Sequence, residues 1–244
     1  ENLVVPGRDT EDRVGHGTAA AGLLLGSAEL GLAGLCPEAV AVPIVCYDRY
    51  PSGVTARGDG GTLAEAIRLA VDVYRCRILN ISMGQTEDDP ELRAAVEYAL
   101  ASGALIVAAV GNDNLTAPDR VYYPAACDGV IGVGAAEGEA PAAFSQRSAV
   151  SLLARGVGLS TVTNRKGARV EVRSGTSFAC AAVSGLCARL WQEDPSLTAA
   201  QVARDVGEPG FDRDSGWGLV ETGPAALPAD VRRQGLPAPA LCLA

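Results

Sequence analysis

Residues 104–112, Ala-Leu-Ile-Val-Ala-Ala-Val-Gly-Asn, decide the fold class of this 244-residue chain. The first seven are apolar without interruption, which is typical of a strand covered on both faces. The run ends at Gly111-Asn112, and in open α/β sheets the ligand lies beyond the carboxyl ends of the strands. This stretch therefore predicts a central strand of a parallel sheet with a functional site at its end.

The segments around this strand alternate between the two kinds of secondary structure. Alternation of strand and helix on this spacing builds right-handed crossovers and a buried parallel sheet. We therefore predict a three-layer α/β fold with a mostly parallel central sheet flanked by helices. The predicted strands are 39–46, 78–82, 104–110 and 130–134, and the predicted helices between them are 62–75 and 90–102.

Beyond residue 144 the pattern changes to shorter strands. Residues 164–167 form a turn signal between runs at 159–163 and 168–173, which predicts a hairpin. The helical pattern at 178–192 is apolar nearly all round and is expected to be buried. We expect one catalytic domain over 1–223 and a loosely packed, Pro/Ala-rich extension over 224–244.

Composition narrows the classes of function. Twenty basic and twenty-nine acidic side chains give a net charge of −9 without long runs, which argues against nucleic-acid and anionic-membrane partners. No stretch reaches the roughly 18 apolar residues of a membrane span, and residues 1–30 lack the pattern of a signal peptide. The composition predicts a soluble globular protein.

The seven cysteines are odd in number and lack metal-binding spacing, so we expect buried free thiols. Unpaired thiols favour a reducing, cytoplasmic compartment. A processed chain would already have lost an export signal, so the compartment stays open.

Three residues carry the chemistry, although each has a structural alternative. His16, the only histidine, stands between two glycines and is the one candidate for a neutral-pH base. Ser177 begins the apolar helix, where it could be a cap or a nucleophile beside backbone N–H groups. Asn112 could end its strand as a turn residue or donate to an oxyanion.

Taken together and in order, these motifs resemble the subtilisin-like (subtilase) serine protease family. The resemblance runs from Gly15 to about Glu221 and rests on six motifs. They are His16-Gly17-Thr18 with Gly22, Asn80-Ile81-Ser82-Met83-Gly84, Gly111-Asn112, Tyr123-Pro124-Ala125, Gly175-Thr176-Ser177 and Gly216-Trp217-Gly218-Leu219-Val220. It implies a serine endopeptidase with His16 as general base, Ser177 as nucleophile and Asn112 in the oxyanion hole.

The resemblance also implies where a peptide or protein substrate binds. The substrate would lie as an added strand between Gly60-Gly61 and Ser82-Met83-Gly84. Ala109, Val110 and Gly111 would form one wall of the pocket for the residue before the scissile bond, and Tyr122 its floor. Since tyrosine is bulky, we expect a small or short residue there. Calcium is common in the family, but no Asp-rich loop predicts a metal site, and no cofactor is expected.

The family's triad aspartate has no clear counterpart. It ends an apolar strand tens of residues before the histidine, whereas Glu1, Asp9, Glu11 and Asp12 follow no such run. Three explanations stay open. The aspartate lies on a strand that is missing from this sequence, or on a separate segment or chain; another acid replaces it; or the protein is a catalytically silent pseudoprotease that binds peptides.

Overall fold

A computed structural model describes residues 1–50, 52–206, 219–220 and 240–243. Its main sheet has the order β13-β10-β8-β7-β6-β14-β3, and β9 pairs with β8. All neighbours along this order are parallel, and only β9 is antiparallel. The strands are β3 (Val40–Pro43), β6 (Ile78–Ile81), β7 (Leu105–Ala109), β8 (Ile131–Glu137), β9 (Ala140–Pro141), β10 (Leu152–Arg155), β13 (Leu219–Val220) and β14 (Ala240–Leu243).

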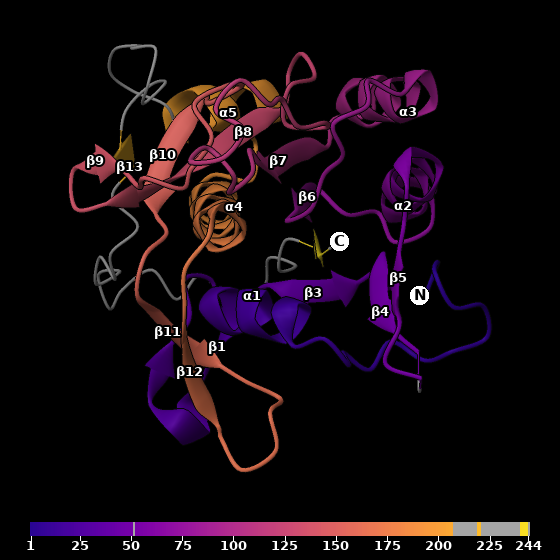
Figure 1. Ribbon diagram of the computed structural model, residues 1–244. Coiled ribbons are helices and arrows are strands. Elements are labelled where there is room, and N and C mark those ends of the chain that lie inside the picture. Colours follow the sequence, from indigo (N-terminus) through magenta and orange to yellow (C-terminus); the bar gives the residue numbers. More distant parts are fainter. Residues whose placement is uncertain (51, 207–218, 221–239, 244) are drawn as a thin grey trace.

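Helices cover both faces of this sheet, as the alternating pattern predicts. Figure 1 shows α2 and α3 together on one side of β6 and β7, and α4 on the other. The α2 and α3 side chains share one apolar cluster, whereas those of α1, α4 and α5 share a second. The helices are α1 (His16–Leu25), α2 (Gly60–Asp72), α3 (Pro90–Ala101), α4 (Thr176–Glu193) and α5 (Ala199–Val206), with a 3-10 turn at Ala28–Leu30. The three-layer α/β fold is confirmed.

The packing of β7 explains why its sequence is apolar at every position. Ile106 and Ala108 pack into the cluster beneath α2 and α3, while Leu105 and Val107 pack into the cluster beneath α4. Successive side chains of a strand point to opposite faces, so a strand between two helical layers needs apolar residues at every position.

Three small antiparallel pairs project from the main body. The predicted hairpin at 159–173 is present as β11 (Leu159–Val162) and β12 (Val170–Arg173). A second hairpin joins β4 (Tyr47–Arg49) to β5 (Thr55–Arg57), and β1 (Gly26–Ser27) pairs with β2 (Leu32–Ala33). The β4–β5 hairpin has a direct bearing on the site.

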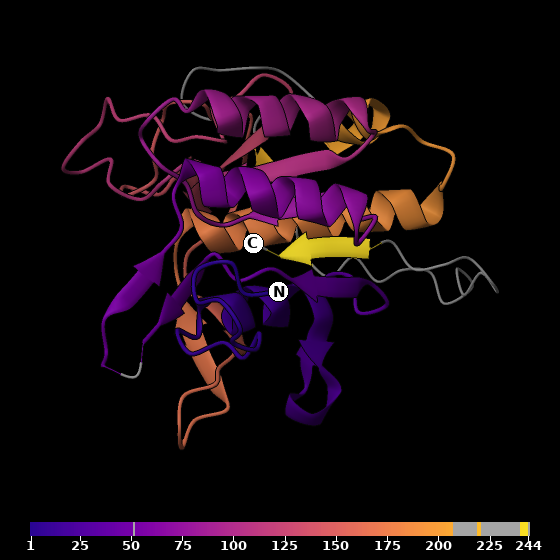
Figure 2. The same ribbon diagram turned by 90° about the vertical axis from the view of Figure 1, so that its right-hand side faces the viewer.

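Strand β14 lies inside the sheet, between β3 and β6. Its backbone pairs with both neighbours in parallel, Ala240 with Val40 and Leu241 with Ile78. Figure 2 shows it as a yellow arrow beside β3. Most of the extension expected over 224–244 lies outside the described residues, but 240–243 are a paired strand and not part of a loose tail.

Candidate active site

The carboxyl ends of the central strands and the first turns of α1 and α4 surround a cavity of about 850 Å³. His16, Asn112 and Ser177 all line it, although 160 positions separate the first from the last. Most of the predicted pocket residues line it too: Ser82, Met83, Gly84, Ala109, Gly111 and Tyr122. The sheet edge predicted from residues 104–112 is therefore the place where the three chemical groups meet.

Ser177 is the second residue of α4 and is 7% exposed to solvent. Its Oγ donates a hydrogen bond to the Ser82 carbonyl at 3.1 Å, and the Ser82 hydroxyl donates back to the Ser177 carbonyl at 3.0 Å. Neither bond serves as a helix cap, since Gly175 occupies the N-cap position. The hydroxyl sits where the helix dipole and free N–H groups stabilise a developing oxyanion.

Asn112 is held in one orientation by the start of the same helix. Its Oδ1 accepts the Thr176 N–H at 2.8 Å. With the oxygen engaged, the Nδ2 group remains as a donor, and it has no acceptor within the described part of the chain. An amide donor beside a nucleophile at a helix N-terminus is suited to a tetrahedral oxyanion.

His16 begins α1 directly after Gly15, whose φ of 88° lies in the left-handed region that favours glycine. The Phe178 ring lies 5.5 Å from the imidazole, between centroids. Burial lowers the pKa of His16 below its usual 6.5; Asp12 opposes this change and Arg173 adds to it. The imidazole is therefore neutral near pH 7, as a general base must be.

Because His16 is the only histidine, its pKa can be measured from a single imidazole resonance in a proton NMR titration. We expect a midpoint below 6.5, rising in Arg173→Gln and falling further in Asp12→Asn. Stability should fall as pH drops below 6.5, because the unfolded chain takes up this proton first. Asp9→Asn is the matched control and should not move the midpoint; a wild-type midpoint at or above 6.5 would contradict the expectation.

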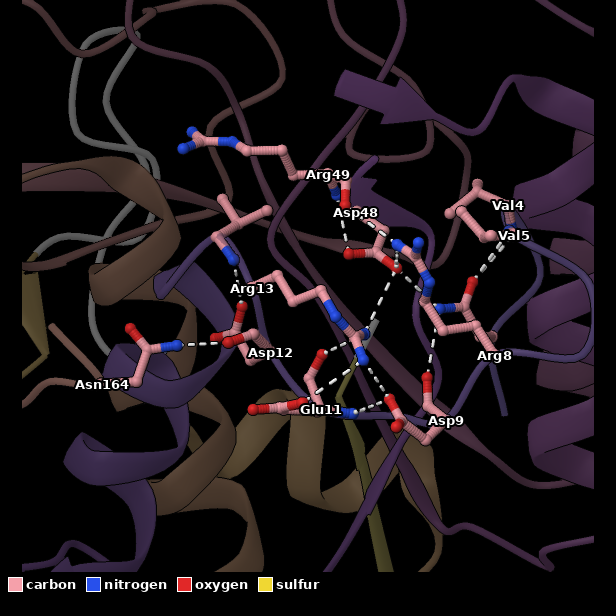
Figure 3. Close-up of polar contacts among 12 residues, drawn as sticks. Val4, Val5, Arg8, Asp9, Glu11, Asp12, Arg13, Asp48, Arg49 and Asn164 are labelled. Atoms are coloured by element: carbon pink, nitrogen blue, oxygen red, sulfur yellow. Dashed lines mark hydrogen bonds and ion pairs between the residues drawn. The ribbon is translucent and has the colours of Figure 1, made fainter. Parts of the chain in front are cut away.

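The acids that precede His16 are engaged elsewhere (Figure 3). Asp9 and Glu11 are exposed and pair with Arg13. Asp12 accepts backbone N–H groups of Val14 and Gly15 through Oδ1, and that of Thr18 through Oδ2. Glu1 is exposed, and its amino group donates to the Pro43 carbonyl. In the part of the chain that the structure describes, none of these acids forms a hydrogen bond with His16.

A buried carboxylate that sequence reasoning missed lies behind this loop. Asp48, 1% exposed, accepts hydrogen bonds from Asn2 and Arg8 and lies 3.6 Å from Arg13 (Figure 3). Burial alone would raise the pKa of Asp48, but these hydrogen bonds and that of the Arg49 N–H lower it overall. Asp48 thus ties the segment leading to His16 onto the β4–β5 hairpin.

We expect Asp48→Asn to lower the free energy of unfolding by about 1–3 kcal/mol, because Arg8 and Arg13 lose their shared carboxylate. Since the pKa of Asp48 is lowered, this contribution should be present above about pH 4 and vanish as pH falls through the folded value. Urea unfolding at pH 7 and at low pH measures both effects. Asp88→Asn, which removes an exposed ion pair with Arg93, is the control; an equal loss in both variants would contradict the role.

Two predicted parts of the binding wall lie elsewhere. Val110 packs into the core beneath α2 and α3, because it follows Ala109 and successive strand positions alternate in direction. Gly60 and Gly61 form the first turn of α2, where Asp59 caps the Thr62 N–H, so they are helical and offer no extended edge. The residue of this region that lines the cavity is Arg57, at the end of β5.

Tyr122 lies against Gly111 and closes one side of the cavity. A Cβ atom on residue 111 would come within 2.4 Å of the Tyr122 ring. The φ angle of Gly111, 106°, also favours glycine at this position. The Tyr122 hydroxyl donates to Asp113 at 3.0 Å, which fixes the ring. The Tyr122 ring therefore occupies the side of the cavity at Gly111.

The cysteines and the metal-ligating side chains of the described residues were the other candidates for reactive groups. The six cysteines within residues 1–206 are free and buried, as expected, and burial raises the pKa of Cys180, on the same helix as Ser177, to about 12. The described residues contain no group of three metal-ligating side chains and no helix suited to crossing a membrane. Ser177 is the nucleophile candidate in the cavity because its hydroxyl lies in the first turn of α4, beside free backbone N–H groups.

Comparisons with known proteins agree with this geometry. The model of the subtilase family matches residues 2–218. Minor extracellular protease Epr of Bacillus subtilis is 34% identical over 222 residues, covering 86% of this chain and 33% of that protein. An intracellular serine protease of Paenibacillus polymyxa is 35% identical, covering 82% and 59%. The solved structure of sphericase has a TM-score of 0.73 and 26% identity, covering 90% and 82%.

The chain thus spans between about a third and three fifths of the length of these two sequence relatives. Their printed names include both an extracellular and an intracellular protease, so they assign no compartment to this chain.

Proposed function

Because the chain belongs to the subtilase family, we propose that it is the catalytic domain of a serine endopeptidase acting on peptides or proteins. The observation that carries the proposal is the single cavity lined by His16, Asn112 and Ser177. These groups supply a base, an oxyanion donor and a nucleophile, the three elements of acyl transfer.

In the proposed reaction, the Ser177 hydroxyl leaves the Ser82 carbonyl and attacks the peptide carbonyl carbon while His16 accepts its proton. The resulting oxyanion accepts hydrogen bonds from the Ser177 N–H and the Asn112 amide. Collapse breaks the C–N bond, and His16 protonates the departing amine. Water then attacks the acyl-enzyme in the same way and regenerates Ser177.

We further propose that the carboxylate orienting His16 is delivered by a strand, from this chain or from a separate segment, that takes the position β14 occupies between β3 and β6 in this structure. A strand in this position runs parallel to its neighbours, so its carboxyl end reaches the sheet edge that carries Ser82 and Ser177. Loss of an orienting aspartate costs about 10⁴ in turnover in a serine protease.

A fluorophosphonate probe tests the proposal, because it labels only an activated serine. We expect labelling of the protein at Ser177, abolished in Ser177→Ala. The alternative is a silent peptide-binding module, which is favoured by the lack of a carboxylate on His16 among the described residues. Peptide binding without labelling of the natural full-length protein would support that alternative.

The position of Tyr122 supports a preference for a small residue before the scissile bond, because its fixed ring narrows the cavity at Gly111. A series of peptides varied at that residue measures it: we expect kcat/KM to fall from alanine to phenylalanine. A strong preference for large aromatic residues would contradict the proposal.

A further inference from the structure

Among the described residues that line the cavity, one cation, Arg57, has no carboxylate partner. Asp12 is surrounded by backbone N–H groups, Asp113 pairs with Arg120, and Arg173 pairs with Glu171 at 2.8 Å. Arg57 has no carboxylate within 4.0 Å among the described residues, and it lines the cavity from the end of β5.

The Arg57 guanidinium contacts Gly84, another residue of the cavity lining. Its Nη2 donates to the Gly84 carbonyl at 2.6 Å, while the side chain stays exposed. Gly84 is part of the segment 82–84 along which an extended peptide would pair. A bond to a neutral carbonyl uses one of five guanidinium donors and leaves the positive charge unmatched.

We propose that Arg57 selects substrates with an acidic side chain two to four residues before the scissile bond; this inference rests on the proposed function. The reacting carbonyl must lie at Ser177, whose hydroxyl contacts the Ser82 carbonyl. Gly84 is two residues farther along, about 6.6 Å in an extended chain. A peptide carboxylate at that distance meets the guanidinium, forming a charge-assisted, bidentate pair.

Because the protein is negatively charged as a whole, the preference for an acidic side chain should be confined to the peptide position that faces Arg57. At −9 the molecule as a whole repels acidic peptides. An acidic residue at another substrate position makes no ion pair that would offset this repulsion. An acidic residue that faces Arg57 makes one. The preference should therefore be confined to one position of the peptide and should weaken as salt screens the pair.

The test uses fluorogenic peptides that carry Glu, Gln or Lys in turn at each of the three positions, with the natural full-length protein. At one position we expect kcat/KM for Glu to exceed that for Gln by roughly 3- to 10-fold. The ratio should fall to about 1 in Arg57→Gln, and Arg57→Glu should favour Lys. Arg49→Gln is the matched control, on the same hairpin but outside the cavity lining, and should keep the wild-type ratio.

Binding of the same peptides to Ser177→Ala, followed by fluorescence anisotropy, separates the two proposals. Binding that prefers Glu through Arg57, without turnover by the unmutated protein, would overturn the protease proposal, and with it the selection of substrates, and would leave Arg57 as a residue that selects bound peptides. Turnover with the same Glu/Gln ratio in the wild type and in Arg57→Gln would overturn the role of Arg57 alone. Failure of every peptide to bind would overturn both.

Discussion

Replacing Ser177 with alanine is expected to lower kcat by about 10⁶-fold, a magnitude established for the nucleophile of a subtilisin. The reason is that the Oγ atom forms the bond to the substrate, so its removal leaves no atom at this position to form the acyl-enzyme. Peptide affinity should stay close to that of the wild type, because the lost atom makes one hydrogen bond, to the Ser82 carbonyl. Initial rates on a fluorogenic peptide and anisotropy of a bound one measure the two quantities.

Ser184→Ala is the matched control for this substitution. Ser184 lies on the same helix and is fully buried, but its hydroxyl donates to Asn80 and lies outside the cavity lining. We expect a loss of about 1 kcal/mol in the free energy of unfolding and kcat within a few-fold of wild type. If Ser177→Ala retained more than about a hundredth of the wild-type kcat, Ser177 would not be the nucleophile.

The sequence predicts well those parts of the fold in which every residue has the same kind of surroundings, such as a strand covered on both faces. Residues 104–110 are apolar at every position because both faces of β7 are covered, and this pattern needs no knowledge of distant residues. The three chemical residues could be named because each lies in a short glycine-containing motif at an element boundary: His16 between Gly15 and Gly17, Asn112 after Gly111, and Ser177 two residues after Gly175. Their meeting in one cavity follows from the parallel direction of the strands.

The parts that sequence reasoning missed depend on contacts between distant segments. Asp48 is buried because the loop carrying Arg8 and Arg13 packs on its hairpin, and nothing within β4 signals that partner. The family resemblance implied an extended edge at Gly60-Gly61, yet the Asp59 cap makes these two residues helical. Strand β14 is held by backbone pairing with β3 and β6. Its Pro/Ala-rich surroundings in the sequence do not indicate this pairing.

Asn112→Ala is expected to lower kcat by about 10²–10³-fold with little change in KM, because the amide donates to an oxyanion that exists only after attack. The alanine also removes the acceptor of the Thr176 N–H, which could disturb the start of α4. Asn112→Asp separates the two roles, since a carboxylate keeps the acceptor but cannot donate and repels the oxyanion. We therefore expect Asn112→Asp to be at least as impaired as Asn112→Ala.

Asn114→Ala provides the control for the loop itself, because its amide donates to the Ala143 carbonyl and the residue lies outside the cavity lining. Its kcat should stay within a few-fold of wild type. Recovery of activity in Asn112→Asp would show that the side chain acts by holding the Thr176 N–H, and the oxyanion role would be lost. An equal rise of KM in both Asn112 variants with unchanged kcat would likewise assign Asn112 to substrate binding, since an interaction made only in the transition state must appear in kcat.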